Sequence, residues 1–192
     1  MERAYTANNE NDASLVALIE RCRKDDRKAQ KELFVMFAGK MMTMCRRYAQ
    51  YEHEAEDLLQ EGFIKVFINL GSFKNEGSFE GWVRRVFVHS ILRNINSSTF
   101  RHDAHFPEDA NDPAMPPLVI DKLSSEEIIS YIGQLPLGYK TVFNLAIIEG
   151  YSHKEIANLL NIEEATSRSQ LLKARKMLQK KIESSNEVSI KK

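Results

Sequence analysis

The prolines of this chain are confined to one part of it, and that distribution limits the possible folds. None occurs in the first 106 residues, and the five present stand at positions 107, 113, 116, 117 and 136. Because proline breaks helix interiors and is excluded from the middle of a sheet, the first half is free to form long helices. Apolar residues recur at helical spacing, and no useful stretch alternates as a half-buried strand would. The sequence therefore predicts an all-α protein.

The prolines also divide the chain. Residues 105–122 combine four of them with acidic residues, a composition typical of a linker. A length of 192 residues suits one to two domains at about 150 residues each, and a hydrophobic content of 43% is enough for a core. We expect an N-terminal helical bundle (12–100), an acidic linker (101–122), a C-terminal helix-turn-helix domain (123–183) and a tail (184–192).

The net charge is zero, but charge alternates in blocks along the chain. The net charges are +6 over residues 21–47, −5 over 50–64, +4 over 81–102, −6 over 103–127 and +4 over 163–181. This alternation excludes a uniformly basic coat and indicates separate surfaces for separate partners.

Cysteine usage and hydropathy favour a cytoplasmic chain. Two cysteines, Cys22 and Cys45, are too few for a disulfide scaffold or a Cys-rich zinc site, and we expect both to be buried thiols. The polar N-terminus has no apolar signal-peptide core. The most apolar window, residues 33–45, is too short to span a membrane and contains Lys40. We expect no membrane insertion.

Helical periodicity predicts four helices in the first half, over residues 14–24, 28–50, 54–70 and 79–96. In the third, Asp57, Gln60 and Glu61 share one exposed face. An acidic face does not approach DNA, so it indicates either a basic protein partner or no partner.

The fourth predicted helix carries a polar stripe at spacings of four, four and three residues: Arg85, His89, Arg93 and Asn96. Three aromatic residues precede it or stand at its start: Phe73, Phe79 and Trp82. Basic residues beside aromatic rings suit single-stranded nucleic acid. Solvated arginines over an aromatic core explain the same pattern equally well.

The second half has the capping and turn residues of a helix-turn-helix. Predicted helices cover residues 139–149 and 153–160, and a long one runs from about 163 to 182. Ser152 and Glu155 form a capping box, and Asn161 provides the left-handed residue of a tight turn. The last helix is rich in hydrogen-bond donors that could meet base edges and phosphates in the major groove. The alternative is an ordinary helix with a solvated basic face.

Taken together, the two halves resemble the extracytoplasmic-function (ECF) group of bacterial RNA polymerase sigma factors. EAEDLLQEGFIKVF is similar to the family's polymerase-binding helix (DAEDLVQEAFLKVW), and SFEGWVRRVFVHSILR to its promoter-melting helix (SFRTWLYRIAVNTALD). The segment from LPLGYKTVF to LLKARKML resembles its upstream-element-reading domain. The resemblance covers about residues 14–98 and 123–183.

The resemblance implies three sets of contact residues. Those for the clamp helices of the largest subunit of core RNA polymerase are Asp57, Gln60, Glu61 and Phe63. Those for the minus-ten element of promoter DNA are Asn69, Phe73, Arg85, Val86, His89 and Arg93. Those for the minus-thirty-five element are Thr166, Ser167, Arg168, Ser169, Leu172, Lys173 and Lys176. It also implies an anti-sigma factor as a further partner.

Two residues depart from the family pattern. His89 stands where Asn is usual, and Arg93 where Asp or Asn is frequent. Histidine both donates and accepts hydrogen bonds, so we expect base capture with an altered preference.

An autonomous helix-turn-helix regulator is the alternative function, and it would bind a palindromic duplex without polymerase. An enzyme is not expected, because the chain has no Gly-rich phosphate loop and no nucleophile elbow. His102 and His105 could suggest a metal pair but have no further clustered ligands. We expect no metal and no cofactor.

Overall fold

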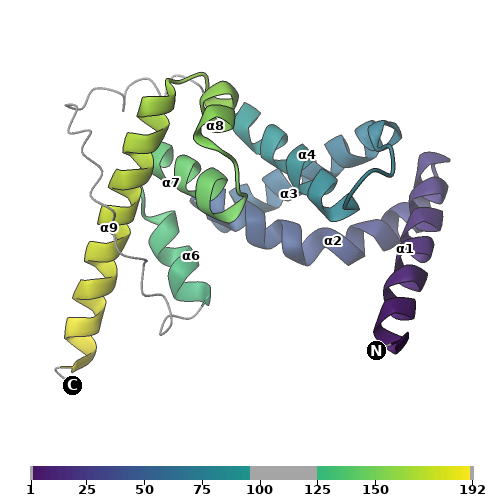
Figure 1. Ribbon diagram of the computed structural model, residues 1–192, viewed down its shortest axis with the longest axis horizontal. Coiled ribbons are helices and arrows are strands. Elements are labelled where there is room, and N and C mark those ends of the chain that lie inside the picture. Colours follow the sequence, from purple (N-terminus) through teal and green to yellow (C-terminus); the bar gives the residue numbers. More distant parts are fainter. Residues whose placement is uncertain (1, 96–124, 191–192) are drawn as a thin grey trace. The chain divides into compact units, whose positions relative to one another are not determined.

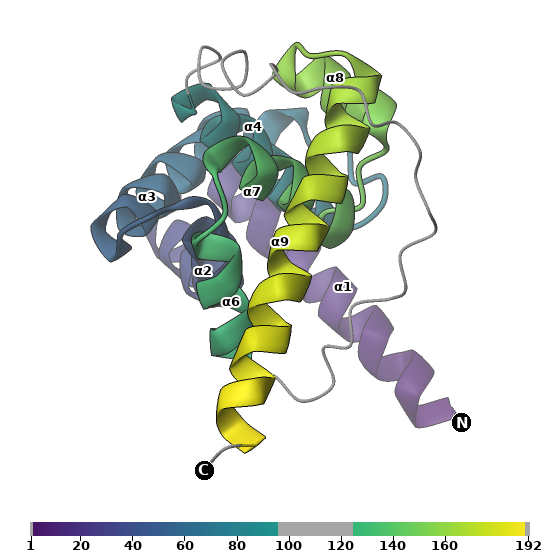
Figure 2. The ribbon, with the colours of Figure 1, turned by 90° about the vertical axis from the view of Figure 1, so that its left-hand side faces the viewer.

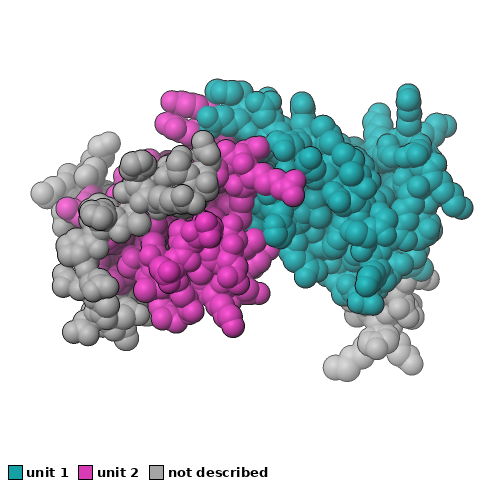
Figure 3. All heavy atoms as spheres, turned by 90° about the horizontal axis from the view of Figure 1, so that it is seen from above, with its two compact units in different colours: residues 1–45, 52–91 teal, residues 46–51, 92–192 magenta. Residues whose placement is uncertain are grey.

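The computed structural model describes residues 2–95 and 125–190, and within these ranges the regular elements are helices (Figure 1). No strand occurs among the described residues, in agreement with the all-α prediction. The chain forms two compact units: residues 1–45 with 52–91, and residues 46–51 with 92–192 (Figure 3). The predicted linker, with its candidate pair His102 and His105, lies outside the described residues.

Unit 1 is built from consecutive helices. They are α1 (Glu2–Arg23), α2 (Arg27–Tyr48), α3 (Glu52–Asn69), the short 3₁₀ turn η1 (Leu70–Ser72) and α4 (Phe79–Asn94). The last residues of α2 (46–48) and of α4 (92–94) belong to unit 2. The sequence predicted the first helix to start near Ser14, but the structure extends it back to Glu2. The polar segment before Ser14 contains neither glycine nor proline, so nothing in it stops a helix.

The turn between α1 and α2 is fixed by local hydrogen bonds. Asp25 adopts a left-handed conformation with φ 58°. Asp26 then accepts hydrogen bonds from the backbone N–H groups of Lys28 (2.9 Å) and Ala29 (3.1 Å), which caps the start of α2. Arg21 also binds this carboxylate through two nitrogens, and these bonds lower the pKa of Asp26.

The core of unit 1 is aromatic where α3 and α4 cross. The Phe63 and Phe87 rings meet edge to face at 5.3 Å, and Phe87 is fully buried. A Cβ atom at Gly62 would lie 2.3 Å from the Phe87 ring, so only glycine allows this close approach. Cys22 and Cys45 are both buried free thiols, as predicted.

Unit 2 contains the remaining helices: α6 (Ser125–Gly133), α7 (Leu137–Phe143), the π-helical segment η2 (Asn144–Ile148), α8 (His153–Leu160) and α9 (Glu164–Ile190). Helices α6, α7 and α8 all pack against α9 (Figures 1 and 2). The long helix was predicted to end near residue 182 but continues to Ile190. Its last residues include serine and asparagine, but no glycine or proline ends the helix earlier.

Buried polar groups of unit 2 satisfy backbone carbonyls in residues 46–51. The Asn144 amide donates to the Arg47 carbonyl (2.9 Å), and the Lys140 ammonium donates to the Ala49 carbonyl (3.3 Å). These carbonyls lie at and just after the end of α2, where intrahelical donors run out. Arg47 also pairs with the carboxylate of Glu149 at 2.9 Å. The contacts explain why Lys140 and Asn144 are buried.

Candidate nucleic-acid interface

The acidic face predicted on α3 is present at the surface. Asp57 and Gln60 are exposed, and Glu61 is half-buried. Phe63 differs, because it is only 3% exposed and its ring packs 4.6 Å from that of Phe34. The structure therefore places Phe63 in the core, and we leave it out of the contact surface. Its position follows from α4 covering that side of α3.

The same face of α3 also carries two exposed isoleucines that the sequence analysis missed. Ile64 is 56% exposed and Ile68 is 70% exposed. With Asp57 and Glu61 they follow spacings of four, three and four residues, so all four lie along one side of the helix. The sequence could have indicated them, because neither isoleucine lies on the buried apolar stripe of α3. Exposed apolar side chains beside acids are typical of a protein-binding surface.

Helix α4 presents the predicted polar stripe, apart from Asn96, which lies outside the described residues. Arg85, His89 and Arg93 are all exposed and lie one turn apart, whereas Val86 is half-buried beside them. Asn69 is exposed at the end of α3, where its amide donates to the Lys65 carbonyl at 2.7 Å. The exposed stripe can meet phosphates or base edges along one line.

The loop before α4 is held in a specific conformation. Asn75 and Gly77 both have positive φ angles (57° and 75°), so the chain turns sharply there. The guanidinium of Arg23 donates to the backbone carbonyls of Leu70 and Phe73 and ties the loop to α1. Phe73, a predicted minus-ten contact, is thereby directed inward and is 6% exposed.

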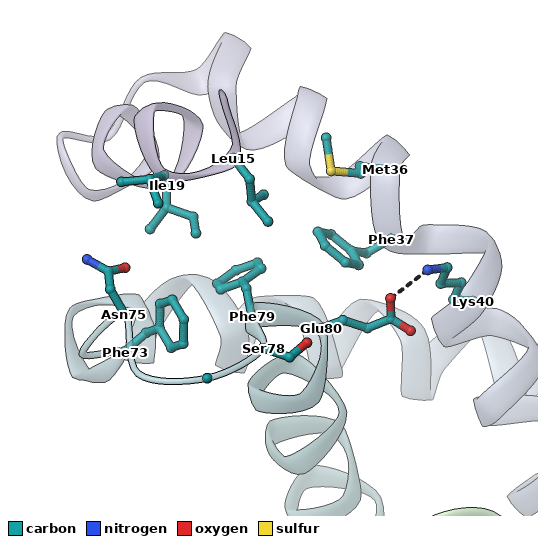
Figure 4. Close-up of a pocket in the computed structure, with 12 residues that line it drawn as sticks. Leu15, Ile19, Met36, Phe37, Lys40, Phe73, Asn75, Ser78, Phe79 and Glu80 are labelled. Carbon is teal, nitrogen blue, oxygen red and sulfur yellow. Dashed lines mark hydrogen bonds and ion pairs between the residues drawn. The ribbon is translucent and has the colours of Figure 1, made fainter. Parts of the chain in front are cut away.

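A cavity of about 640 Å³ opens beside this loop, between α1, α2 and the start of α4 (Figure 4). Rings of Phe37 and Phe73 meet the central ring of Phe79 at 5.5 and 5.0 Å. An ion pair between Lys40 and Glu80, at 2.5 Å, lies at one side of the cavity (Figure 4). Its lining combines aromatic and aliphatic side chains with polar groups, among them Lys40, Asn75 and Glu80. Periodicity did not indicate the cavity, because its walls come from separate helices.

The helix-turn-helix has the predicted local geometry. Ser152 and Glu155 form a complete capping box at the start of α8, with the Ser152 N–H donating to the Glu155 carboxylate at 2.8 Å. These bonds lower the pKa of Glu155. Asn161 is left-handed, with φ 53° and ψ 52°, and turns the chain toward α9. Both predictions from the sequence are confirmed.

The predicted minus-thirty-five residues of α9 fall into three groups by exposure. Arg168, Ser169 and Lys176 are exposed, and a half-buried set accompanies them: Thr166, Leu172 and Lys173. Ser167 is fully buried, so its hydroxyl does not reach a base edge in this conformation, and we leave it out of the reading surface. Arg168 pairs with Glu164 one turn earlier in α9.

Among residues 2–95 and 125–190, no group of three or more His, Cys, Asp or Glu side chains is placed to hold a metal ion. Within the same described part of the chain, each helix is too short or too polar to cross a bilayer.

Comparison with known proteins agrees with this arrangement. The family described as "Sigma-70 region 2" matches residues 33–101, and "Sigma-70, region 4" matches residues 125–178. The "ECF RNA polymerase sigma-E factor" of Haemophilus influenzae is 29% identical over 179 residues, which are 87% of this chain and 94% of the relative. The "ECF RNA polymerase sigma factor SigW" of Bacillus subtilis is 27% identical over 184 residues, 85% and 94% of the two chains.

A solved structure has the same fold. The sigma factor RpoE of Bartonella quintana, crystallised with the anti-sigma factor NepR, superimposes with a TM-score of 0.50 at 18% identity. The match covers 80% of this chain and 96% of that one.

Proposed function

Because the chain belongs to the ECF group of the sigma-70 family, we propose that it directs core RNA polymerase to specific promoters as a dissociable initiation factor. The observation that carries this proposal is the order of the two matched regions along the chain, 33–101 and then 125–178. The exposed faces of α3, α4 and α9 supply the three surfaces that such a factor needs.

The polymerase-binding surface is the exposed side of α3. Asp57, Gln60 and Glu61 offer charge and hydrogen bonds to a basic partner, and Ile64 and Ile68 add apolar area. Charge complementarity of this kind accelerates association and selects the partner, whereas apolar burial contributes most of the affinity.

Strand separation is assigned to α4 and the loop before it. Arg85, His89 and Arg93 contact the backbone and edges of the unpaired strand, and an extruded base is held near the Phe73 loop. Unpairing a base costs a few kcal/mol. A factor that binds only the unpaired form shifts the equilibrium toward the open promoter by its differential affinity.

The upstream duplex is read by α9. Arg168 and Ser169 stand in its first two turns and are exposed, and Lys173 and Lys176 follow further along. This order matches the usual division between base contacts at the start of a recognition helix and phosphate contacts beyond it.

The proposal includes a cytoplasmic location and an anti-sigma factor that covers one or more of these surfaces. The protein contributes binding free energy and carries out no covalent chemistry. It needs no cofactor.

Two measurements test the function. Run-off transcription with purified core polymerase on a promoter library should give discrete transcripts that depend on this chain. A gel shift on the selected promoters should show binding only when core polymerase is present. Tight binding to a palindromic duplex without polymerase would instead identify an autonomous helix-turn-helix regulator.

A further inference from the structure

A side-chain hydrogen bond links the two helices of the helix-turn-helix, in addition to their apolar packing. His153 is the first residue of α8, and its Nδ1 lies 2.8 Å from Oγ of Ser167 in the first turn of α9. Ser167 is fully buried and His153 is half-buried. The contact bridges the tight turn at Asn161, so it ties the start of the supporting helix to the start of the reading helix.

A second buried polar residue follows Ser167 along α9. Gln170 lies one turn beyond Ser167 on the same side of α9 and is 2% exposed. Neither its Oε1 nor its Nε2 has a hydrogen-bond partner among the described residues. The His153–Ser167 bond is a polar contact that can orient this part of α9, in addition to the apolar packing of α8 against it.

The surroundings favour the neutral imidazole. Burial lowers the pKa of His153, and the nearby positive charges of Arg168 and Arg175 lower it further, while Glu164 acts in the opposite direction. A neutral ring has one donor and one acceptor nitrogen, so either tautomer can bond the serine hydroxyl.

We propose that His153 is a positioning residue for sequence reading, because its bond to Ser167 holds the first turn of α9 where Arg168 and Ser169 meet base edges. Arg168 follows Ser167 directly, so a rotation of this turn moves both readers. Without the imidazole, the Ser167 hydroxyl would turn to a carbonyl of its own helix, and the first turn of α9 would lose its hydrogen bond to α8. The inference rests on the proposed function of α9.

The test compares full-length variants bound to core polymerase. The probe is a pool of promoter duplexes that is randomised across the upstream element, with bound duplexes separated and sequenced. His153→Phe keeps the ring size but removes the hydrogen bond, and Ser167→Ala removes its partner. His153→Gln restores a neutral hydrogen-bonding group, and Asn158→Ala, at an exposed position of α8, is the matched control.

We expect His153→Phe and Ser167→Ala to reduce the preference at the bases read by Arg168 and Ser169 by about threefold to tenfold, the range that one net hydrogen bond supports. His153→Gln should recover most of this preference, and Asn158→Ala should keep all of it. Thermal unfolding of each variant confirms that the compared chains are folded.

Two results would overturn the inference. Preferences as sharp as wild type in both His153→Phe and Ser167→Ala would show that the bond positions nothing. An equal loss of binding to every duplex in the pool would reduce it to a general structural contact. If the wild-type complex itself enriched no upstream sequence, the assigned function of α9 would fail first, and that outcome is distinguishable from both.

Discussion

Arg168 is the exposed side chain that we connect most directly with base recognition. Its pair with Glu164 is a surface contact of the i,i+4 kind, worth about 0.3–0.5 kcal/mol, and is easily exchanged for a base edge. We expect Arg168→Ala to cost about 1–3 kcal/mol on the preferred promoter and to relax specificity at one base position. Binding of the polymerase complex to single-base-pair variants of the upstream element measures this. Uniform weakening on all of them would make Arg168 a phosphate contact.

His89 lies at the centre of the exposed stripe on α4. A residue that acts after strand separation should matter for opening and not for assembly on polymerase. We therefore expect His89→Ala to weaken promoter opening more than polymerase binding. Permanganate reactivity of unpaired thymines and a separate polymerase-binding titration measure the two steps. Equal loss in both assays would contradict the assigned role.

His153 also predicts an acid sensitivity. Its pKa is lowered in the folded state, so the folded chain binds fewer protons than the unfolded chain on the acid side of the ordinary histidine pKa of about 6.5. Stability is therefore lost as the pH falls from about 6.5 through the folded-state value. We expect His153→Gln to lose less stability than wild type between about pH 7 and pH 5, as measured by urea unfolding at each pH. The same loss in both chains would refute this.

At the scale of helix packing, the α3–α4 crossing depends on Gly62. Alanine is more favourable than glycine in a helix interior by about 1 kcal/mol. At position 62, however, its Cβ atom would collide with the Phe87 ring. Overpacking of a core costs about 1–3 kcal/mol, so we expect Gly62→Ala to lower the free energy of unfolding by about 1 kcal/mol.

A double-mutant cycle identifies the cause. Gly62→Ala should cost less in a Phe87→Leu background, because the smaller side chain leaves room for the added methyl group. Denaturant unfolding of the four chains gives the coupling free energy. A more stable Gly62→Ala chain would mean that α3 and α4 adjust their spacing without strain.

At the scale of the whole molecule, function depends on association with polymerase. Replacing both exposed isoleucines of α3, Ile64→Ser with Ile68→Ser, should weaken polymerase binding at least about tenfold, since fully burying one such side chain contributes about 1.5–3 kcal/mol. The fold should be unaffected because both side chains face solvent. Val35→Ser, at a 67% exposed position of α2, is the matched control. A double variant that binds like this control would remove α3 from the interface.

Local sequence was sufficient to predict much of the helix-turn-helix in the C-terminal unit. The capping box of Ser152 with Glu155 and the left-handed turn at Asn161 depend on a few adjacent residues, and the structure has both. The exposed stripe of Arg85, His89 and Arg93 likewise follows from helical spacing alone.

The same spacing misjudged residues at the edge of an apolar face. Ser167 was expected to contact DNA but is buried, and the polar Gln170 of the same helix is buried as well. Which border positions become covered depends on where α7 and α8 lie against α9. The π-helical segment η2 was not predicted either, because a one-residue widening of a helix leaves no clear mark in the hydrophobic pattern.

The helical content, the helix-turn-helix and the three candidate surfaces could be predicted from local sequence, because periodicity, capping and charge act between residues close in the chain. The packing of the helices was needed to show that Phe63 and Ser167 are interior, that Ile64 and Ile68 are exposed, and that a cavity lies beside the Phe73 loop. Burial is decided by contacts between helices far apart in sequence. The hydrophobic pattern of a sequence shows which side of a helix is apolar, but not how far the neighbouring helices cover that side.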